Sequence, residues 1–560
     1  MLRRFSVAVA LALLMGGWQR AQQTYPPIYM DPAPLLDAAA KEIGADAVKC
    51  VTFSGSGYDG AVGQAVESGP NIDWPRKDTL ANYTRTINFE TRTMKEEFDR
   101  KPGLNPASWK YGLGWQDGTP IQKNAHQTFI LNGDYGWHMD GVGAPPVAAP
   151  PSDVELWKLE MWMTPIGFIK AARLPGANPK ATWRWELGEV GRDPSTTIPE
   201  KTYNIVININ GKYKMDATMN GQNRLQRIHT MVSEPSLGDF NYEHEYPTQV
   251  QFGPIKFPTT FHSHQGWDDN YNYDNVSAGH NAFGGSMKTV LPNECPDLVP
   301  VPDSVRQATF PMTVTPQKLG NGVWLMGGGP ANSIAIEFRD YIAVFEAPIN
   351  EQRSLAVIQE IVKLVPNKPI RFVVNSHQHF DHTGGLRAYD TMGATIITHN
   401  SNAAFLKRDV LNYKPRAVLP DLMSSVPPTE LGEGYHLEVL NENYALANGG
   451  RVLQIFYIQP LQHAHGMVVA YLPDEKIIME ANLFDTHEPP PEMPTPAMKT
   501  FYNSVKLLKL DVSQIAPVHG KPVPWADFVK AMGKSVDVCF ETGTTGGGVV
   551  MTECHDGKKP

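Results

Sequence analysis

The stretch Ser376-His377-Gln378-His379-Phe380-Asp381-His382-Thr383-Gly384-Gly385 predicts both the fold and the chemistry of this chain. Three histidines and one aspartate fall within six of its residues, a dense cluster for a chain with 17 histidines in 560 positions. The cluster follows directly after residues 371–375, an apolar run with the composition of a buried strand. Because imidazoles and carboxylates are preferred ligands of Zn²⁺, the cluster predicts a metal site at the end of that strand.

The spacing within the cluster indicates where each side chain points. His377 and His379 are two positions apart, so their rings point to the same side of an extended backbone. Asp381 and His382 follow where the chain turns, and we expect them to face a second point nearby. The pair Gly384-Gly385 is expected to let the chain turn sharply into the next helix.

Around this motif, strand-like runs alternate with a helical pattern between about residues 312 and 535. The helix is expected at 351–364, where Leu355, Ile358 and Ile361 form an apolar stripe. The strands are expected at 323–326, 333–338, 341–345, 371–375, 394–398, 452–457, 467–472 and 476–479. This alternation predicts a layered α/β C-terminal domain at 312–535, with residues 536–560 as a tail.

The preceding part, 25–300, is rich in aromatic and strand-like runs and predicts a different architecture. A run at 81–92 and another at 224–232 read as strands, and Asn210-Gly211 reads as a hairpin turn between two more. One or two helices are expected within 154–172. We therefore expect a β-rich α+β N-terminal domain with a curved antiparallel sheet. Prolines between 296 and 315 mark the boundary with the C-terminal domain.

The run His377–Gly385, HQHFDHTGG, resembles the HxHxDH motif of the metallo-β-lactamase superfamily. Two later elements follow in the order of that family: His463 in His-Ala-His-Gly and His519 in Pro-Val-His-Gly. The resemblance covers about 312–530. It implies a four-layer αββα sandwich with the metal ions at one edge of its two sheets.

The resemblance also implies how the ligands divide between two metal positions. His377, His379 and His463 would form one metal site. Asp381, His382 and His519 would form the other.

Two positions depart from the family pattern. Asn482 takes the place of an aspartate that bridges the two ions in many hydrolases of the family, and we include it among the metal ligands. An amide binds a cation more weakly than a carboxylate does, which puts full occupancy of the second position in doubt. His465 and Glu480 are substitutes that we consider less favoured. Glu346 is expected to orient ligands without binding metal.

Taken together, the residues and the resemblance imply an enzyme with a small-molecule substrate. A metal-bound hydroxide would attack an ester, lactone, thioester or lactam carbonyl, with Asp381 as the catalytic residue that orients it and takes its proton. One or two Zn²⁺ ions per chain are expected, and iron and manganese remain alternatives. The competing hypothesis is a metal-binding scaffold of the same fold with weak or no catalysis.

The N-terminal part has a second, diffuse resemblance, carried by residues 162–168 and 237–258. These segments are similar to the leading domains of some secreted bacterial proteins of the superfamily, which look like the half-barrels of lipoprotein-carrier proteins. This resemblance brings no catalytic residues with it.

Composition sets further limits. The net charge of −9 and the lack of a strongly basic segment argue against nucleic-acid binding. Residues 1–21 read as a signal peptide, and no later apolar run approaches ~20 residues, so we expect a periplasmic or secreted protein without stable membrane insertion. Of the four cysteines, Cys539 and Cys554 are expected to form a disulfide.

Overall fold

The computed structural model describes residues 28–102, 125–187, 199–266, 281–427 and 435–533, and the backbone of 537–541 and 550–554. Within these ranges, positions 68, 70–73, 75, 297, 460, 462, 487, 488, 492 and 493 are left out. The predicted signal peptide at 1–21 lies outside the described residues.

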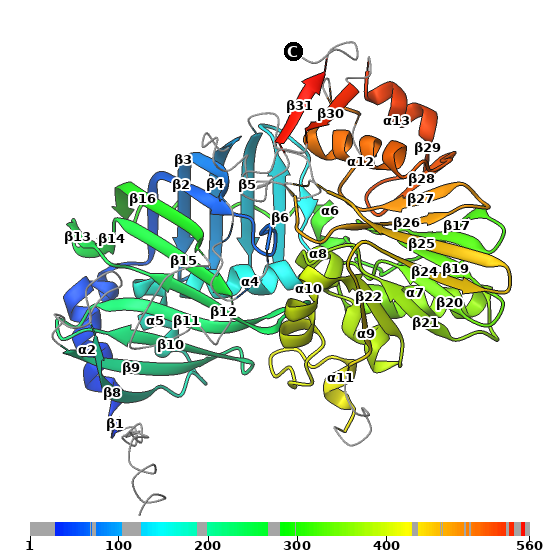
Figure 1. Ribbon diagram of the computed structural model, residues 1–560. Coiled ribbons are helices and arrows are strands. Elements are labelled where there is room, and N and C mark those ends of the chain that lie inside the picture. The colour runs from blue at the N-terminus through cyan, green and yellow to red at the C-terminus, as the bar shows by residue number, and fades with distance from the viewer. Residues whose placement is uncertain are drawn as a thin grey trace, which may run out of the picture.

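The N-terminal part is built on one antiparallel sheet, which curves around three helices (Figure 1). Its 14 strands lie in the order β1-β8-β9-β10-β11-β12-β15-β16-β2-β3-β4-β5-β6-β7. In chain order they are β1 (Ile28–Met30), β2 (Cys50–Gly60), β3 (Arg76–Asn88), β4 (Thr93–Pro102), β5 (Ala125–Asn132), β6 (Tyr135–Asp140), β7 (Val147–Ala148), β8 (Lys180–Leu187), β9 (Pro199–Ile209), β10 (Tyr213–Met219), β11 (Leu225–Glu234), β12 (Gly238–Glu245), β15 (Thr260–Gly266) and β16 (Asn281–Pro292). The predicted β-rich domain with a curved antiparallel sheet is confirmed.

Helices α2 (Pro32–Ile43), α4 (Pro151–Trp162) and α5 (Pro165–Ala172) pack against this sheet. Ile166 and Phe168 of α5 are fully buried in the same core as Met215 of β10. The remaining elements of this part are η1 (Ala45–Ala47) and the hairpin β13 (Gln249–Phe252) and β14 (Ile255–Pro258). The sheet buries its concave face on the helices and so forms one large core.

Two turns of this sheet show how local chemistry sets the strand ends. Asn210 and Gly211 have φ of 52° and 67°, the conformation of a tight hairpin turn, as the sequence predicted. The prediction of one strand over 81–92 was wrong at its end, because β3 stops at Asn88. The Asn88 side chain accepts hydrogen bonds from the N–H groups of Glu90 and Thr91, which bends the chain into the turn before β4.

The C-terminal part is the predicted αββα sandwich. One sheet has the order β17-β18-β19-β20-β21-β22-β23 and the other β24-β25-β26-β27-β28-β29. The first comprises β17 (Thr315–Gly320), β18 (Val323–Gly327), β19 (Ser333–Glu337), β20 (Ile342–Phe345), β21 (Ile370–Val374), β22 (Thr395–His399) and β23 (Leu437–Leu440). The second comprises β24 (Asn443–Asn448), β25 (Arg451–Tyr457), β26 (Val468–Leu472), β27 (Ile477–Glu480), β28 (Gln514–Pro517) and β29 (Val523–Pro524).

Three apolar cores hold these layers together: one between the two sheets and one between each sheet and its helices. The helices of the first sheet are α7 (Glu351–Leu364), α8 (Phe380–Thr383), α9 (Leu386–Thr391), α10 (Asn400–Phe405), the π-helix η3 (Leu406–Val410) and α11 (Leu422–Ser425). Those of the second are α12 (Pro496–Leu507) and α13 (Trp525–Ala531). Strands β20 to β23 run parallel, so the chain crosses back through a helix between them.

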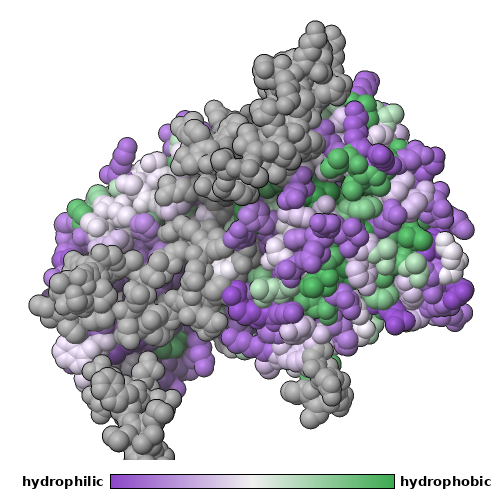
Figure 2. All heavy atoms as spheres, viewed as in Figure 1, coloured by the Kyte–Doolittle hydropathy of each residue, from purple (hydrophilic) through white to green (hydrophobic). Residues whose placement is uncertain are grey.

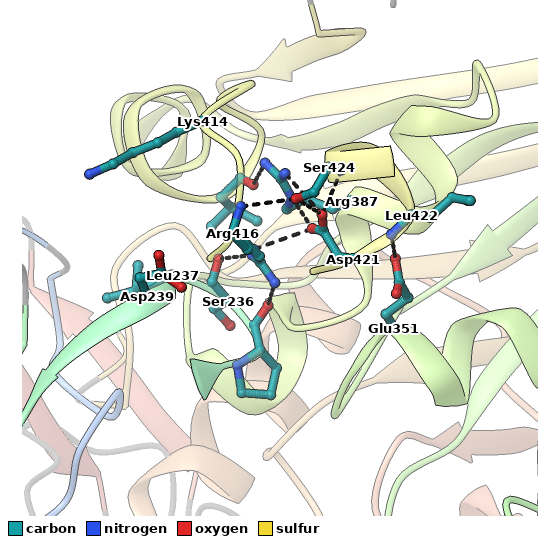
Figure 3. A network of polar contacts seen from close by, with 12 residues as sticks. Ser236, Leu237, Asp239, Glu351, Arg387, Lys414, Arg416, Asp421, Leu422 and Ser424 are labelled. Carbon is teal, nitrogen blue, oxygen red and sulfur yellow. Dashed lines mark hydrogen bonds and ion pairs between the residues drawn. The ribbon is translucent and has the colours of Figure 1, made fainter. Parts of the chain in front are cut away.

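The two parts are joined by polar contacts at one corner of the sandwich (Figure 3). Arg416 donates hydrogen bonds to the carbonyl oxygens of Pro235 (2.7 Å) and Ser236 (2.8 Å). Asp239 accepts the backbone N–H groups of Ala417 and Val418. The loop between η3 and α11 is thereby tied to the turn between β11 and β12 of the N-terminal sheet.

A disulfide joins Cys50 at the start of β2 to Cys295 after β16. Strands β2 and β16 are neighbours in the sheet. The bond therefore attaches the segment that runs from β16 to the short helix α6 (Asp303–Arg306) to the start of β2. The sequence did not identify this pair. Strands β30 (Asp537–Glu541) and β31 (Val550–Cys554) pair antiparallel, but the side chains of Cys539 and Cys554 lie outside the description, so their disulfide stays a prediction.

On the face shown in Figure 2, the described surface of the C-terminal part mixes hydrophilic residues with groups of hydrophobic ones. Within the described parts of the chain, no helix is both long and apolar enough to cross a membrane.

Candidate metal centre

The histidine-rich motif folds where β21 ends and the short helix α8 begins. His379 caps the N-terminus of α8, and His377, His379 and His382 are buried, with exposed fractions of 0%, 1% and 0%. The ring centroids of His377 and His379 lie 4.5 Å apart, and those of His377 and His382 lie 4.2 Å apart. Asp381 is more accessible, because its side chain keeps 26% of its surface exposed.

His377, His379 and His463 form a first group, with one ring nitrogen of each lying within 4.8 Å of the others. His377 Nε2, His379 Nδ1 and His463 Nε2 are buried and have no hydrogen-bond partner. The opposite nitrogens of His377 and His379 are occupied, because His377 Nδ1 bonds Ser376 Oγ (2.8 Å) and His379 Nε2 bonds Ala65 O (3.1 Å). Because Ala65 O can only accept, His379 Nε2 donates and its inner nitrogen keeps a free lone pair, as metal binding requires.

The protonation states agree with this role. Burial lowers the pKa of His377 and His463 well below the usual range, and it lowers the pKa of His379 to about 4. All three imidazoles are therefore neutral at pH 7, and a neutral imidazole is the form that binds a cation.

Asp381, His382 and His519 form a second group. His382 Nε2 lies 3.2 Å from Asp381 Oδ2 and 3.3 Å from His519 Nε2, and His519 Nε2 lies 3.8 Å from Asp381 Oδ2. Ligands at the usual Zn²⁺ distances in a tetrahedral shell would be ~3.3–3.6 Å apart. The three atoms thus have the spacing of three corners around one ion.

Glu346 holds His382 from behind. Its Oε2 lies 2.6 Å from His382 Nδ1, and its Oε1 accepts the backbone N–H of Ser376 (2.5 Å). Burial alone would lower the pKa of His382. The neighbouring carboxylates of Asp381 and Glu346 outweigh burial and raise this pKa well above its usual value. Glu346 therefore keeps Nδ1 protonated, and a cation bound at Nε2 would take the place of the second proton.

Asn482 follows β27 and is buried, with 4% of its surface exposed. Its φ of 58° is in the left-handed region, and neither its Oδ1 nor its Nδ2 has a hydrogen-bond partner. A buried amide with both ends unpartnered is costly unless it meets a ligand or water.

The two substitutes weighed for Asn482 are engaged elsewhere. His465 is half exposed and pairs with Glu67 across 2.7 Å. Glu480 is buried and accepts the backbone N–H of Leu483 (2.8 Å), and burial raises its pKa to about 8. A carboxyl group that is largely protonated at neutral pH is a poor cation ligand.

No sequence pattern indicates that residues 61–67 of the N-terminal part contact the centre. Gln64 Nε2 donates to Asp381 Oδ1 (2.7 Å), and Ala65 O accepts from His379. Gln378 Nε2 donates to the carbonyl oxygens of Ala65 (3.1 Å) and Val66 (2.7 Å). Because this segment lies over 300 residues before the motif and has no distinctive composition, only the folded structure reveals it.

A second missed residue is Asn332, which fixes the turn that carries His519. Its side-chain amide donates to the carbonyl oxygens of Pro517 (3.1 Å) and Gly520 (2.8 Å), and its backbone N–H donates to Val518 O (2.8 Å). In the sequence, Asn332 and the turn at 327–330 resemble the start of the first half of the metallo-β-lactamase superfamily, but that resemblance assigns Asn332 no contact.

The glycine pair after the motif serves close packing and not a sharp turn. Gly384 and Gly385 have ordinary φ of −61° and −104°. A Cβ on Gly384 would lie 2.3 Å from Ile349 O, and one on Gly385 would lie 2.0 Å from Ser354 Oγ. The expected turn is thus corrected: glycine is needed because α7 and the loop before it approach the backbone.

Residues 326–479 match the family model of the metallo-beta-lactamase superfamily. No curated protein matches the sequence. Among solved structures, a metallo-beta-lactamase from Pontibacter korlensis is 17% identical with a TM-score of 0.31, covering 39% of this chain and 97% of its own.

Two further solved structures are similar. The metallo-beta-lactamase FIM-1 from Pseudomonas aeruginosa, in its mono-zinc form, is 20% identical with a TM-score of 0.29 and covers 39% of this chain and 93% of its own. The metallo-beta-lactamase from Hirschia baltica is 20% identical with a TM-score of 0.27, and the match covers 39% of this chain and 96% of that protein.

Proposed function

We propose that this chain is a metal-dependent hydrolase, because residues 326–479 match the family model of the metallo-beta-lactamase superfamily. The observation that carries the proposal is the set of buried, unpartnered nitrogens on His377, His379 and His463, beside a second group of two imidazoles and a carboxylate. This donor set fits Zn²⁺, and also iron or manganese. A metal ion bound there would supply a water nucleophile at neutral pH and polarise a carbonyl group.

The protein's own residues divide the remaining work. Asp381 is the one member of the second group with an accessible side chain, and Gln64 fixes its Oδ1. Asp381 Oδ2 is then directed at His382 and His519, where it can orient the attacking water and accept its proton. The substrates this chemistry serves are esters, lactones, thioesters and lactams.

Export is part of the proposal. The basic and then apolar segment at 1–21 has the pattern of a signal peptide. The Cys50–Cys295 disulfide supports an oxidising compartment, so we assign the protein to the periplasm or the exterior.

The test combines metal analysis of the purified chain with a screen of nitrocefin, lactones and simple esters. We expect at least one bound ion per chain and hydrolysis of one class. His379→Ala should abolish that hydrolysis and lower the bound metal, because it removes one of three nitrogens of the first group. Near-wild-type turnover with full metal content would contradict the assignment, and metal binding without any turnover would favour the scaffold hypothesis.

A further inference from the structure

A cavity of about 620 Å³ lies inside the N-terminal part. Its walls come from the concave face of the long sheet, mainly β2 to β6, β12 and β15, and from helix α4. Figure 1 shows α4 beneath these strands. The volume falls in the range of pockets that bind small molecules, roughly 300–1,000 Å³.

One part of the cavity wall adjoins the metal centre. Gly60, Ala61, Val62 and Gln64 belong to its wall, and Gln64 is also the residue that donates to Asp381. A single side chain therefore separates the cavity from a residue of the second group. A molecule that fills the cavity would have its end next to the candidate centre.

The cavity wall carries an excess of negative charge. Its described lining residues include five carboxylates but only two guanidinium groups. The carboxylates are Asp59, Glu96, Asp140, Asp153 and Glu160, and the guanidinium groups are Arg85 and Arg100. Because these carboxylates outnumber the guanidinium groups, the wall favours a cation over an anion.

Glu160 is a buried carboxylate of this wall with several polar partners. Arg85 donates to Glu160 (3.0 Å) and to Glu96 (2.8 Å), so two carboxylates share one guanidinium group. Glu160 also accepts from the Tyr242 hydroxyl and lies 3.4 Å from His244. Although burial opposes it, His244 and Arg85 hold the pKa of Glu160 far below its usual value, so this carboxylate stays ionised.

Aromatic rings cover much of the remaining wall. Four aromatic residues line the cavity: Tyr83, Phe98, Phe129 and Trp157. The ring centroid of Phe98 lies 6.3 Å from that of Tyr83 and 5.8 Å from that of Phe129. Aromatic faces next to carboxylates bind organic cations, because the ring quadrupole and the anion attract the same charge.

We propose that this cavity binds the non-reacting part of the substrate, and that this part ends in an organic cation such as a substituted ammonium group. The inference rests on the proposed hydrolase function for its catalytic readout. In this arrangement the ammonium group lies among the rings and carboxylates, and the carbonyl group reaches past Gln64 to Asp381.

The catalytic test compares two para-nitrophenyl esters that differ in one atom. One acyl chain ends in a trimethylammonium group and the other in a tert-butyl group of the same shape. A cation–π contact and a nearby carboxylate should make kcat/KM about tenfold higher for the charged ester. Glu160→Gln should reduce that ratio, while Asp134→Asn, which removes an exposed carboxylate outside the cavity, should leave it unchanged.

A binding test works without turnover and covers the case in which Glu160→Gln does not fold. Benzyltrimethylammonium is titrated into wild-type protein and into metal-poor His379→Ala protein, with tryptophan fluorescence as the signal because Trp157 lines the cavity. Saturable binding to both proteins, with benzyl alcohol binding at least about tenfold more weakly, is expected.

The outcomes separate the two proposals. Cation binding without hydrolysis of any ester would refute the hydrolase and keep the cavity assignment. Hydrolysis with no preference for the charged ester, together with no saturable binding of benzyltrimethylammonium, would overturn the cavity assignment and keep the hydrolase.

Discussion

Asn482 is the residue at which this centre departs most from the pattern that its motif implies. Its amide is buried and unpartnered, and the second group would hold an ion with Asp381 as its one charged ligand. Cation binding depends on ligand charge, so the second position should be the weaker one. The weaker second position could be predicted from the sequence, because the ligands follow one another along the chain in the order of the motif and Asn482 stands where an aspartate is expected.

We predict that fewer than two ions remain firmly bound per chain after dialysis, and that Asn482→Asp strengthens the second position by roughly tenfold. Asp tolerates the left-handed φ of 58°, so the backbone should not change. Zn²⁺ titration with metal analysis measures both sites. Asn443→Asp is the control, because it adds the same charge on the exposed strand β24.

Two equally tight sites in the natural sequence, unchanged by Asn482→Asp, would show that Asn482 does not limit binding. Because His465 and Glu480 are engaged elsewhere, a water molecule would then be the simplest remaining ligand.

At the scale of elements, the C-terminal sandwich could be predicted closely. The helix expected at 351–364 is α7 with the same bounds, and the expected strands at 371–375 and 394–398 correspond to β21 and β22 within one residue at each end. These elements depend on local apolar patterns, which a sequence displays directly. The strand predicted over 81–92 ran four residues too far, because the Asn88 side chain bends the backbone into a turn.

Asn332 connects two such elements, since it joins the turn before β19 to the turn after β28. Asn332→Ala would leave the buried carbonyl oxygen of Pro517 and the half-buried one of Gly520 without this donor. We expect a loss of about 1–3 kcal/mol in the free energy of unfolding, because unpaired buried polar groups cost this much. We also expect weaker metal binding at the second group, because His519 lies within this turn.

Urea unfolding and Zn²⁺ titration measure the two effects. Asn448→Ala is the matched control, because the Asn448 amide makes its hydrogen bond to Asp340 at the exposed surface. Equal stability of the two variants would indicate that the Asn332 contact contributes little.

At the scale of the whole molecule, contacts between distant segments, such as the pairing of the cysteines, could least be predicted from the sequence. Four cysteines allow three pairings, and the one observed depends on the register of β2 against β16, more than 200 residues apart. Replacing Cys50 and Cys295 together by alanine should lower the free energy of unfolding by roughly 2–5 kcal/mol, because the bond closes a very long loop. Metal content should not change, since Cys50 lies at the opposite end of β2 from the segment that reaches Gln64.

Urea unfolding of the oxidised wild type and the double variant tests the stability effect. Peptide mapping without reduction tests the pairing in the same samples and also shows whether Cys539 and Cys554 are joined. Free thiols on Cys50 and Cys295 in the oxidised protein would contradict the observed bond.

The dependence of the centre on the N-terminal part is the feature that sequence patterns could least reveal. Residues 61–67 supply Gln64 to Asp381 and a carbonyl oxygen to His379, so a contact between the two parts fixes one residue in each group. The backbone there has little freedom, because a Cβ on Gly63 would lie 2.4 Å from the Phe380 ring. The N-terminal part therefore contributes hydrogen bonds to candidate metal ligands of the C-terminal part.

Gln64→Leu tests this dependence with a side chain of similar size. Without the hydrogen bond to Oδ1, the Asp381 carboxylate can rotate away from His382 and His519, and we expect roughly ten- to hundredfold weaker binding at the second group or a similar loss of kcat. Binding at the first group should change far less, because His379 bonds the backbone of Ala65. Gln251→Leu is the control: Gln251 is an exposed residue of strand β13, and its amide donates to Gly253 O (2.8 Å). If both variants kept wild-type affinity at both groups and wild-type kcat, Gln64 would be packing beside Asp381 without positioning it.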